Sequence, residues 1–450
     1  MKSHSSALGE KSLLPLIGKM SAPAVISMSM IAAYNLVDAI FIGYFVGELG
    51  LAALASNIPP GTIFYGFCLF IGVGGNTAIS RSLGRGDVDS ANKVLGVMIL
   101  MVFMFGFLSV LLAFIGPGWI LEMFGATDVL LGPSSGYLEV FLLGGPLGFF
   151  TVAINNVARG EGNAWMAMVS MVMGALVNIA LDPLFIHYLG FGLRGAAWAT
   201  VAGHLVSSTT LLWYLRSGRS SLIFRLANLR FNYGILKEIS SVGLSILLIN
   251  SSWSIIQGLV IRTLVQHGGE TAVSVYGMCN RTIMFFFMPM FGVQAGILPI
   301  LGYNYGARVM WRVRRTIYCG MVLCTVYLLM SWALIQMIPG FFIQAFTDDP
   351  VCLVQGIDAI KKISIAMPSV ALTILIVTTF QAIGKAKYAL FLSANRTIIL
   401  IIPLLLYLPS KIGVDGVWFA FPIADSVAMI INLLFFLRVR QYFRDDEDSG

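Results

Sequence analysis

The sequence predicts an all-α polytopic membrane protein with twelve transmembrane helices, arranged as two parallel repeats of six. Three observations carry this prediction: the composition, the long apolar runs and an internal repeat. Of the 450 residues, 58% are hydrophobic and 11% are charged, whereas a soluble domain carries about 25% charged residues. So few charges could not cover the surface of a soluble chain of this length. A soluble enzyme, a disordered chain and a nucleic-acid-binding domain are therefore excluded as first interpretations.

The transmembrane segments are read from apolar runs, because a spanning helix needs about 20 mostly apolar residues. The runs are much longer than the roughly 9–11 residues of a barrel strand and do not alternate. With ends that vary by a few residues, the predicted spans are 16–45, 51–80, 94–116, 135–158, 165–187, 195–215, 239–266, 271–302, 316–338, 358–383, 387–408 and 416–437.

The positive charges set the orientation. If the N-terminus is cytoplasmic, most of the 28 Lys and Arg fall in cytoplasmic segments, as the positive-inside rule requires. Both termini are then cytoplasmic, and the protein is predicted to be a multi-pass protein of the cell membrane. The same asymmetry accounts for the net charge of +7 without a nucleic-acid partner.

A long basic connection, residues 216–238, divides the chain into a lobe at 1–215 and a lobe at 239–450. An offset of 222 residues superimposes one half on the other. Because six spans lie within that offset, both halves have the same orientation and are related by an axis along the membrane normal. The matched pairs are Gly74 with Gly296, Gly84 with Gly306, Thr151 with Thr373, Gly162 with Gly384, Ala164 with Ala386 and Ala167 with Ala389.

Two acidic residues in the first half are candidates for a cation site. A charge at mid-membrane costs about 2.5–3.5 kcal/mol on insertion scales and generally marks function. Asp38 follows Tyr34 by one helical turn, and Asp182 follows Asn178 by one turn. At 1.5 Å per residue, Asp38 and Asp182 lie about 13 Å and 8 Å below the outer loops. The repeat offset places no acid at either equivalent position, so the site belongs to the N-terminal lobe alone.

The surroundings of Asp182 favour a hard cation. Pro183 has no N–H to donate to the carbonyl of Ile179, which is left free to face an ion. Carboxylate, amide and carbonyl oxygens suit Na⁺, and the carboxylates alone suit a proton. In the alternative interpretation, these polar side chains only hydrogen-bond a neighbouring helix, at about 0.6 kcal/mol per contact.

Other residues have more than one interpretation. Asp425 shares the second half with Arg396, and a buried ion pair between them is expected. Aromatic and Met side chains either line a broad apolar substrate cavity or face lipid; these are Phe64, Tyr65, Phe287, Met288 and Met290. The five cysteines show no paired spacing, so neither a disulfide framework nor a zinc site is expected.

Several segments together resemble the multidrug and toxic compound extrusion (MATE) family, most closely its DinF-like, archaeal-type branch. The resemblance extends over roughly residues 15–437. Its segments are YNLVDAIFIG (34–43), AISRSLGRGD (78–87), NNVARGEGNAW (155–165), NIALDPLFI (178–186), GAAWAT (195–200), PMFGVQAGILPILGYNYGA (289–307) and NRTIILIIPLLLYLP (395–409).

The resemblance implies a V-shaped pair of six-helix bundles and efflux of amphipathic or cationic drugs in exchange for protons or sodium ions. It also implies a cation site in the N-terminal lobe. The positions of this sequence that match that pattern are Asp38, Tyr34, Asp182, Asn178, Asn155 and Thr200. Asn156 is an alternative to Asn155. The resemblance does not decide between proton and sodium.

The expected function is therefore that of a secondary antiporter working by alternating access, which suits two lobes and a one-sided ion site. The protein is not expected to be an enzyme, nor to need a cofactor besides the coupling H⁺ or Na⁺. Its expected partners are small amphipathic or cationic molecules and membrane lipid, and it is expected to be monomeric. A flippase for a lipid-linked sugar is the alternative within the same superfamily. A membrane-embedded enzyme is an alternative from another class, but it needs a nucleophile or metal cluster near an interface, and the sequence shows none. A channel is disfavoured because two repeated lobes with a one-sided ion site suit alternating access better than a continuous pore.

Overall fold

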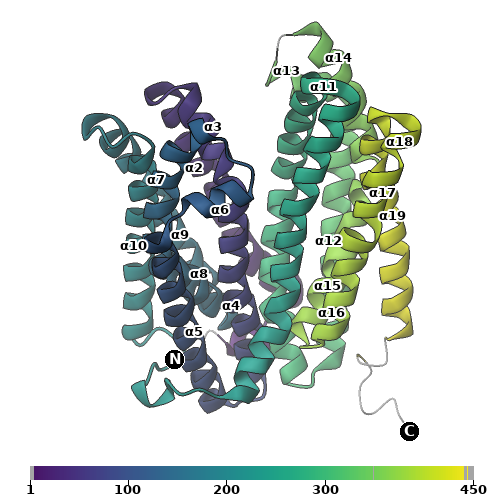
Figure 1. Cartoon of the computed structure of the whole chain (residues 1–450). Coiled ribbons are helices and arrows are strands. Elements are labelled where there is room, and N and C mark those ends of the chain that lie inside the picture. The colour runs from purple at the N-terminus through teal and green to yellow at the C-terminus, as the bar shows by residue number, and fades with distance from the viewer. Residues whose placement is uncertain (1–4, 348, 440–442, 444–450) are drawn as a thin grey trace.

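The computed structural model describes residues 5–347, 349–439 and 443, and helices dominate throughout. They form two bundles that stand side by side, and the first helix begins at the same end of the molecule at which the last helix ends (Figure 1). In the orientation of Figure 1 the bundles lie farther apart at the opposite, outer end. The predicted lobes extend over 1–215 and 239–450. A few of their residues lie outside the described part, namely 1–4, 348, 440–442 and 444–450.

The N-terminal lobe is built from six spans and three short helices. The spans are α2 (Leu13–Phe45), α4 (Ile58–Gly84), α5 (Val88–Ile115), α7 (Asp128–Leu143) with α8 (Gly145–Gly160), α9 (Ala164–Pro183) with the π-helix η1 (Leu184–Tyr188), and α10 (Leu193–Arg216). The short helices are α1 (Ser6–Glu10), α3 (Glu48–Ser56) and α6 (Gly118–Met123).

The C-terminal lobe follows a connection that contains the 3₁₀ turn η2 (Leu226–Asn228). Its helices are α11 (Tyr233–Gly306), α12 (Met310–Met337), α13 (Pro339–Gln344), α14 (Pro350–Ser364), α15 (Met367–Ala382), α16 (Ala386–Ala394), the π-helix η3 (Asn395–Ile401), α17 (Ile402–Tyr407), α18 (Pro409–Ile412) and α19 (Val414–Arg438).

These helices make twelve membrane spans. Eight stretches of helix are long and apolar enough to cross a membrane, and two bent pairs, α7 with α8 and α14 with α15, bring the number to ten. The helix α11 comprises two spans, joined at Gly269, whose φ of 68° breaks the helical geometry. The helix α10, with 24 residues, is the remaining span, although it is less apolar than the others.

The internal repeat is visible in the backbone. The two bent spans break at Gly144 and Ala366, which are 222 residues apart, and bend by 53° and 42°. The same offset relates Gly47 to Gly269, both with positive φ, at the turns between the first two spans of each lobe. Glycine is required there because side chains disfavour that backbone region. The repeated bends and turns show that both halves fold to one plan.

The predicted second span, 51–80, is wrong at its outer end. Residues 48–56 form the separate helix α3, and the span itself begins at Ile58. Pro59 and Pro60 at the first positions of α4 explain the break, since proline starts a helix readily but cannot donate to the preceding turn. The apolar run continues across this break, so hydropathy alone could not locate it.

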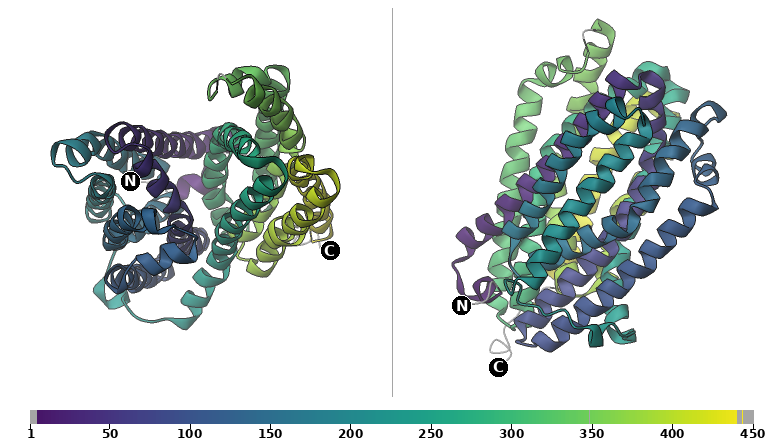
Figure 2. Two further views of the ribbon diagram at one scale, coloured as in Figure 1. Left: turned by 45° about the horizontal axis from the view of Figure 1, so that its top comes forward. Right: turned by 90° about the vertical axis from the view of Figure 1, so that its left-hand side faces the viewer.

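The lobes meet closely at the cytoplasmic end, where the first helix begins and the last helix ends, and α4 packs against α11. Figure 2 shows the two bundles from two further directions. A Cβ added at Gly84 would lie 2.0 Å from the carbonyl oxygen of Tyr303, and one at Gly306 would lie 2.2 Å from that of Arg81. These glycines, related by the repeat, allow two backbones to touch. Arg81 adds a hydrogen bond from Nη1 to Ala382 O at 2.7 Å.

Candidate cation-binding site

Two carboxyl groups meet inside the N-terminal lobe. Asp38 lies on α2 and Asp182 on α9, and their residues are 7% and 0% exposed. The two side chains face each other within hydrogen-bonding range. Ionised carboxylates can only accept hydrogen bonds and repel each other. The arrangement therefore requires a proton between the two groups or a cation beside them.

Asp182 is the less satisfied of the pair. Both of its carboxyl oxygens are buried, and neither has a hydrogen-bond donor within the described part of the chain. Leaving a buried polar atom unpaired costs about 1–3 kcal/mol, and more for a charged one. Such a group attracts whatever positive partner can reach it, and here that partner would be a coupling ion.

Asn178 and Thr200 complete the polar environment. With its amide oriented to satisfy both ends, Asn178 donates from Nδ2 to Asp38 Oδ1 at 3.0 Å and accepts from the Thr200 backbone N–H at 3.3 Å. The Thr200 hydroxyl donates to Ala196 O at 3.1 Å, so its lone pairs remain available. The structure thus brings Asp38, Asp182, Asn178 and Thr200 together from α2, α9 and α10.

The chain changes its helical geometry next to this cluster. The π-helix η1 begins at Leu184, directly after Asp182 and Pro183. Pro183 removes one backbone donor, and π-turns inside helices occur frequently at functional sites. Because Pro183 has no N–H, the carbonyl of Ile179 is predicted to lack the helical hydrogen bond that this residue would otherwise donate.

Two tyrosines stand next to the pair. Tyr34, on α2, interacts electrostatically with Asp38. Tyr137, on α7, interacts with Asp38, Tyr34 and Asp182. Sequence reasoning missed Tyr137, because its proximity depends on how α7 packs against α2 and α9. The available signal was its position in the outer half of a predicted span.

Asn155 lies elsewhere. Its Nδ2 donates to Ala167 O at 2.7 Å and to Ser170 Oγ at 3.2 Å, so it joins α8 to α9. Asn156 instead donates to Val152 O at 2.9 Å and packs against Gly72 of α4. Neither amide contacts the carboxyl pair in this arrangement. Both stay predictions as ligands of the cation.

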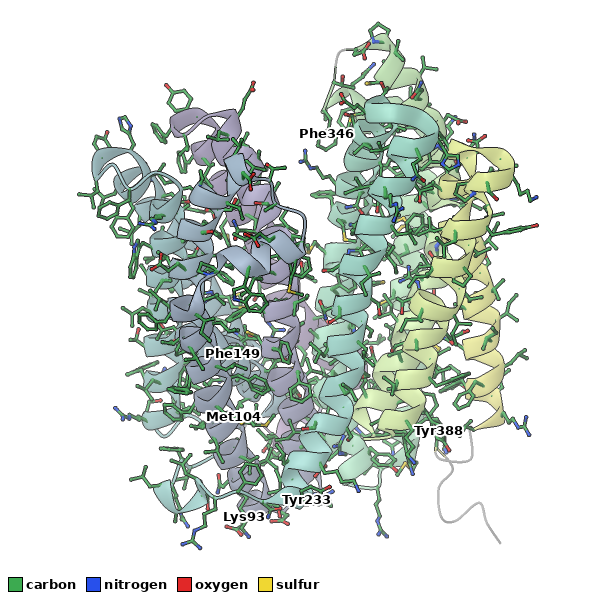
Figure 3. The ribbon with its side chains drawn as sticks, in the orientation of Figure 1. Lys93, Met104, Phe149, Tyr233, Phe346 and Tyr388 are labelled. Carbon is green, nitrogen blue, oxygen red and sulfur yellow. The ribbon has the colours of Figure 1, made fainter. Side chains whose placement is uncertain are left out.

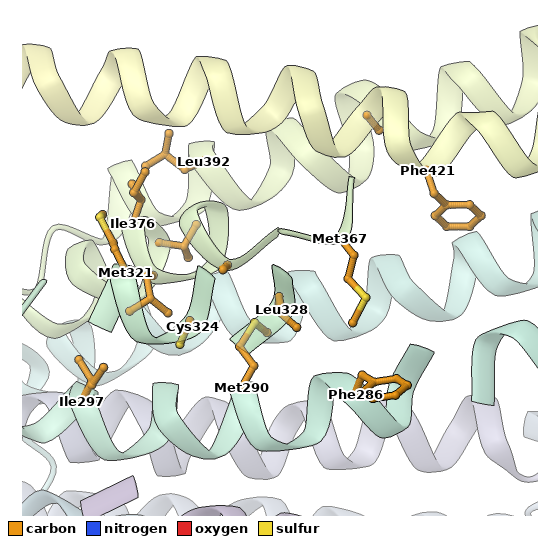
Figure 4. Close-up of a cluster of buried hydrophobic side chains, with 14 of the residues drawn as sticks. Phe286, Met290, Ile297, Met321, Cys324, Leu328, Met367, Ile376, Leu392 and Phe421 are labelled. Atoms are coloured by element: carbon orange, nitrogen blue, oxygen red, sulfur yellow. The ribbon is translucent and has the colours of Figure 1, made fainter. Parts of the chain in front are cut away.

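The predicted substrate-lining residues are divided between different surroundings. Phe64 packs against Phe141 and Phe149 within the N-terminal lobe, and Figure 3 labels Phe149 there. Met290 is fully buried in the C-terminal lobe, among the apolar side chains drawn in Figure 4. Tyr65 is 38% exposed, while Phe287 and Met288 are partly buried. Phe64 is partly buried as well, so all of the five except Met290 retain surface that a ligand could contact.

The second lobe holds the other intramembrane acid. Arg396 Nε donates to Asp425 Oδ1 at 2.6 Å, and the two side chains are 19% and 9% exposed. This acid is neutralised by its partner, whereas the pair in the first lobe has none. Within the described residues, no three His, Cys, Asp or Glu side chains gather as metal ligands. A cation bound at Asp38 and Asp182 would be completed by neutral oxygens.

Comparison with known proteins identifies the family of the whole chain. The family model described as MatE matches residues 23–184 and 245–407. The chain belongs to this family of membrane transporters. Its two matched regions fall on the two lobes, as expected for a repeated unit. MATE proteins are transporters, so the family gives no support for an enzyme.

Relatives match along nearly the whole chain. The multidrug export protein MepA of Staphylococcus haemolyticus is 24% identical over 441 residues, covering 98% of this chain and 97% of MepA. The MATE multidrug transporter DinF-BH, whose structure was solved in complex with a ligand, is 36% identical with a TM-score of 0.92, covering 98% and 99%. An outward-facing multidrug resistance MATE transporter is 26% identical with a TM-score of 0.91, covering 97% and 98%.

Proposed function

We propose that this MATE protein is a secondary antiporter that exports amphipathic or cationic compounds in exchange for protons or sodium ions. The observation that carries the proposal is the buried, facing pair Asp38 and Asp182, whose charge no basic residue of the described chain neutralises. A site that needs a cation to be stable changes its energy whenever an ion enters or leaves. That energy is available to drive a conformational change.

The two-lobe fold supports alternating access. The lobes touch at the cytoplasmic end and lie farther apart at the outer end (Figure 1). A bound ion can shift this arrangement only if its affinity differs between the two conformations. The pair joins α2 to α9, so its occupancy acts directly on α2, which also packs against α11 of the other lobe at Gly292 and Gly296.

Proton and sodium make different demands on the same residues. A proton bridges Asp38 and Asp182 and leaves one negative charge. Sodium needs both groups ionised, with oxygens of Asn178 and Thr200 as further ligands. In the sodium case, purified protein is stabilised saturably by Na⁺ and not by K⁺. In the proton case, a pH gradient drives transport without sodium.

The deciding experiment is gradient-driven transport in proteoliposomes of ethidium, a fluorescent probe that is both amphipathic and cationic. We expect a pH or a sodium gradient to drive ethidium movement through the wild-type protein. Asp38→Asn and Asp182→Asn are each expected to abolish the driven component, because each removes half of the cation site. Ethidium binding should persist, since the acids couple transport rather than bind the drug.

The matched control is Asp128→Asn, the same chemical change at an exposed position at the start of α7. It should retain driven transport. Full gradient-driven transport by folded Asp38→Asn protein would contradict the coupling mechanism for either ion.

A further inference from the structure

A positive charge is also buried in the N-terminal lobe, and the cation site does not use it. Arg159, in the last turn of α8, is 5% exposed. Its hydrogen-bond partner is the weak acceptor Met171 Sδ, 3.6 Å from Nη2. Within the described chain no carboxylate pairs with it, and Tyr65 is the titratable group that acts on it electrostatically. Arginine stays charged in proteins, so the lobe contains an unpaired positive charge.

The nearest acid in sequence does not neutralise this charge. Glu161, two residues further on, accepts hydrogen bonds from Ser220 Oγ, the Ser221 N–H and the Tyr214 hydroxyl. It is therefore turned toward the connection between the lobes. Buried charges are normally paired, because an uncompensated one is costly, so an unpaired arginine at the cytoplasmic end of the lobe calls for a function.

The position of the guanidinium along the length of the lobe is informative. Its neighbour Met171 lies on α9, which runs from the cytoplasmic end outward. Along this helix Asn178 is seven residues and Asp182 eleven residues farther out, or about 10 Å and 16 Å at 1.5 Å per residue. Arg159 thus lies between the carboxyl pair and the cytoplasmic end of the same lobe.

The surrounding layer is polar but carries no negative charge within the described residues. Asn155 and Asn156 lie one turn before Arg159 on α8. Asn76 of α4 is 1% exposed, has no partner for either amide atom and packs against Gly160. A cation that leaves the carboxyl pair and moves inward could bind next to these amide oxygens if no positive charge were present. The guanidinium makes that layer repulsive to cations.

We propose that Arg159 is an electrostatic barrier that stops the coupling ion from passing through the N-terminal lobe to the cytoplasm. Fixed positive charge excludes protons and cations from narrow paths in other membrane proteins by the same physics. The lack of a counter-ion is then required, because a paired carboxylate would cancel the field. The inference depends on the cation coupling proposed above.

The test measures ion leak in proteoliposomes without drug, using an internal pH- or sodium-sensitive dye and an imposed gradient. Wild-type vesicles should be tight. Arg159→Met, which keeps the apolar stem and removes the charge, should increase the leak about tenfold or more. Arg159→Lys keeps the charge and should remain tight. A purely structural role predicts no such dependence on charge.

A second variant leaves the arginine in place. Met171→Glu puts a carboxylate beside the guanidinium, which should stabilise the fold yet cancel the field and open the leak. Met171→Gln is the uncharged control of the same size and should be tight. If Arg159→Met fails to fold, this pair decides the question. Combining either leaky variant with Asp38→Asn should close the leak if ions enter through the site.

Two results would overturn the barrier. Tight vesicles from folded Met171→Glu protein would do so, as would a leak that survives Asp38→Asn. If the proposed antiport function is itself wrong, the result differs, because the wild-type protein would then show no gradient-driven ethidium transport. Driven transport by the wild type together with tight Met171→Glu vesicles rejects the barrier alone.

Discussion

At the scale of single residues, the two lobes treat their buried acids in opposite ways. Asp38 and Asp182 face each other with no basic partner in the described chain, whereas Asp425 pairs with Arg396 at 2.6 Å. A neutralised acid holds helices together, and an unneutralised pair responds to ions. The difference supports ion coupling in the first lobe and a structural role for the pair in the second.

The structural role of Asp425 is testable by neutralisation. Asp425→Asn leaves Arg396 partly buried without a counter-charge, so we expect a loss of stability of about 3 kcal/mol. The double variant Arg396→Met/Asp425→Asn removes both charges and should recover most of the loss. Thermal unfolding in detergent measures the stability of the single and the double variant against that of the wild type. An unchanged Tm for Asp425→Asn would argue against a stabilising pair.

How far the sequence predicts the site depends on which contacts lie within one helix. Asn178 and Asp182 are one turn apart, so helical periodicity alone places them together. The approach of Asp38 to Asp182, and of Tyr137 to both, depends on the packing of α2, α7 and α9, which periodicity does not specify. Asn155 could face either neighbour of α8, and its orientation toward α9 is a packing result.

At the scale of elements, the turn after α8 anchors the connection between the lobes. Glu161 is fully buried and accepts from Ser220 Oγ, at 2.9 Å and 2.8 Å to its two oxygens, and from the Tyr214 hydroxyl at 3.2 Å. The Ile223 N–H donates to Asn92 Oδ1 at 2.8 Å. The first residues of the connection are thereby fixed to the underside of the N-terminal lobe.

This anchor is predicted to depend on pH. Burial raises the pKa of Glu161 from 4.5 to about 7, although hydrogen bonds from Ser220, Ser221 and Tyr214 oppose the shift. The folded state therefore retains the proton that the unfolded state has released. Its contribution to stability is largest below about pH 4.5 and falls as pH rises toward 7, by at most about 3 kcal/mol.

Glu161→Gln isolates this contribution, because it removes the titration and preserves the shape. The difference in Tm between wild type and Glu161→Gln should change between about pH 5 and pH 7.5 and then level off. Protease protection of the 220–223 segment should follow the same course. A difference that is constant across this range would show that Glu161 does not titrate there.

Element boundaries show where hydropathy is insufficient. The apolar composition predicts the existence and type of the spans, since nothing else in a membrane satisfies a long backbone. The breaks at Gly144, Ala366 and Asn57 lie inside continuous apolar runs, and each is set by nearby proline. Local backbone chemistry decides these positions, and the average hydrophobicity of a window does not register it.

At the scale of the whole molecule, the cytoplasmic contact between lobes is a close fit of two symmetry-related glycines. Gly84 and Gly306 each approach a backbone carbonyl of the other lobe so closely that no Cβ fits. Arg81 strengthens the same contact, donating to Ala382 O at 2.7 Å and to Glu238 Oε1 at 2.8 Å. In the proposed alternating-access cycle these backbones must separate, so the contact is expected to stabilise the arrangement in which the lobes meet at the cytoplasmic end.

A methyl group at this contact is therefore expected to shift the conformational equilibrium. Gly306→Ala would place Cβ 2.2 Å from Arg81 O, and we expect the lobes to move apart at the cytoplasmic end to relieve the strain. In a V-shaped molecule that movement brings the outer ends together. Spin labels at the exposed outer positions Val129 and Val351 should then show a larger population at short distance.

The control for this shift is Gly258→Ala, which adds its methyl to open space on α11 and should leave the distance distribution unchanged. If Gly306→Ala also matches the wild type, the glycine contact adapts locally and does not govern the equilibrium between the two arrangements. The hydrogen bonds of Arg81 to Ala382 and Glu238 would then be candidates for the link that governs it, beside those of Arg312 to the backbone of Leu8 and Lys11. In that case Arg81→Met should produce the shift that the methyl group does not.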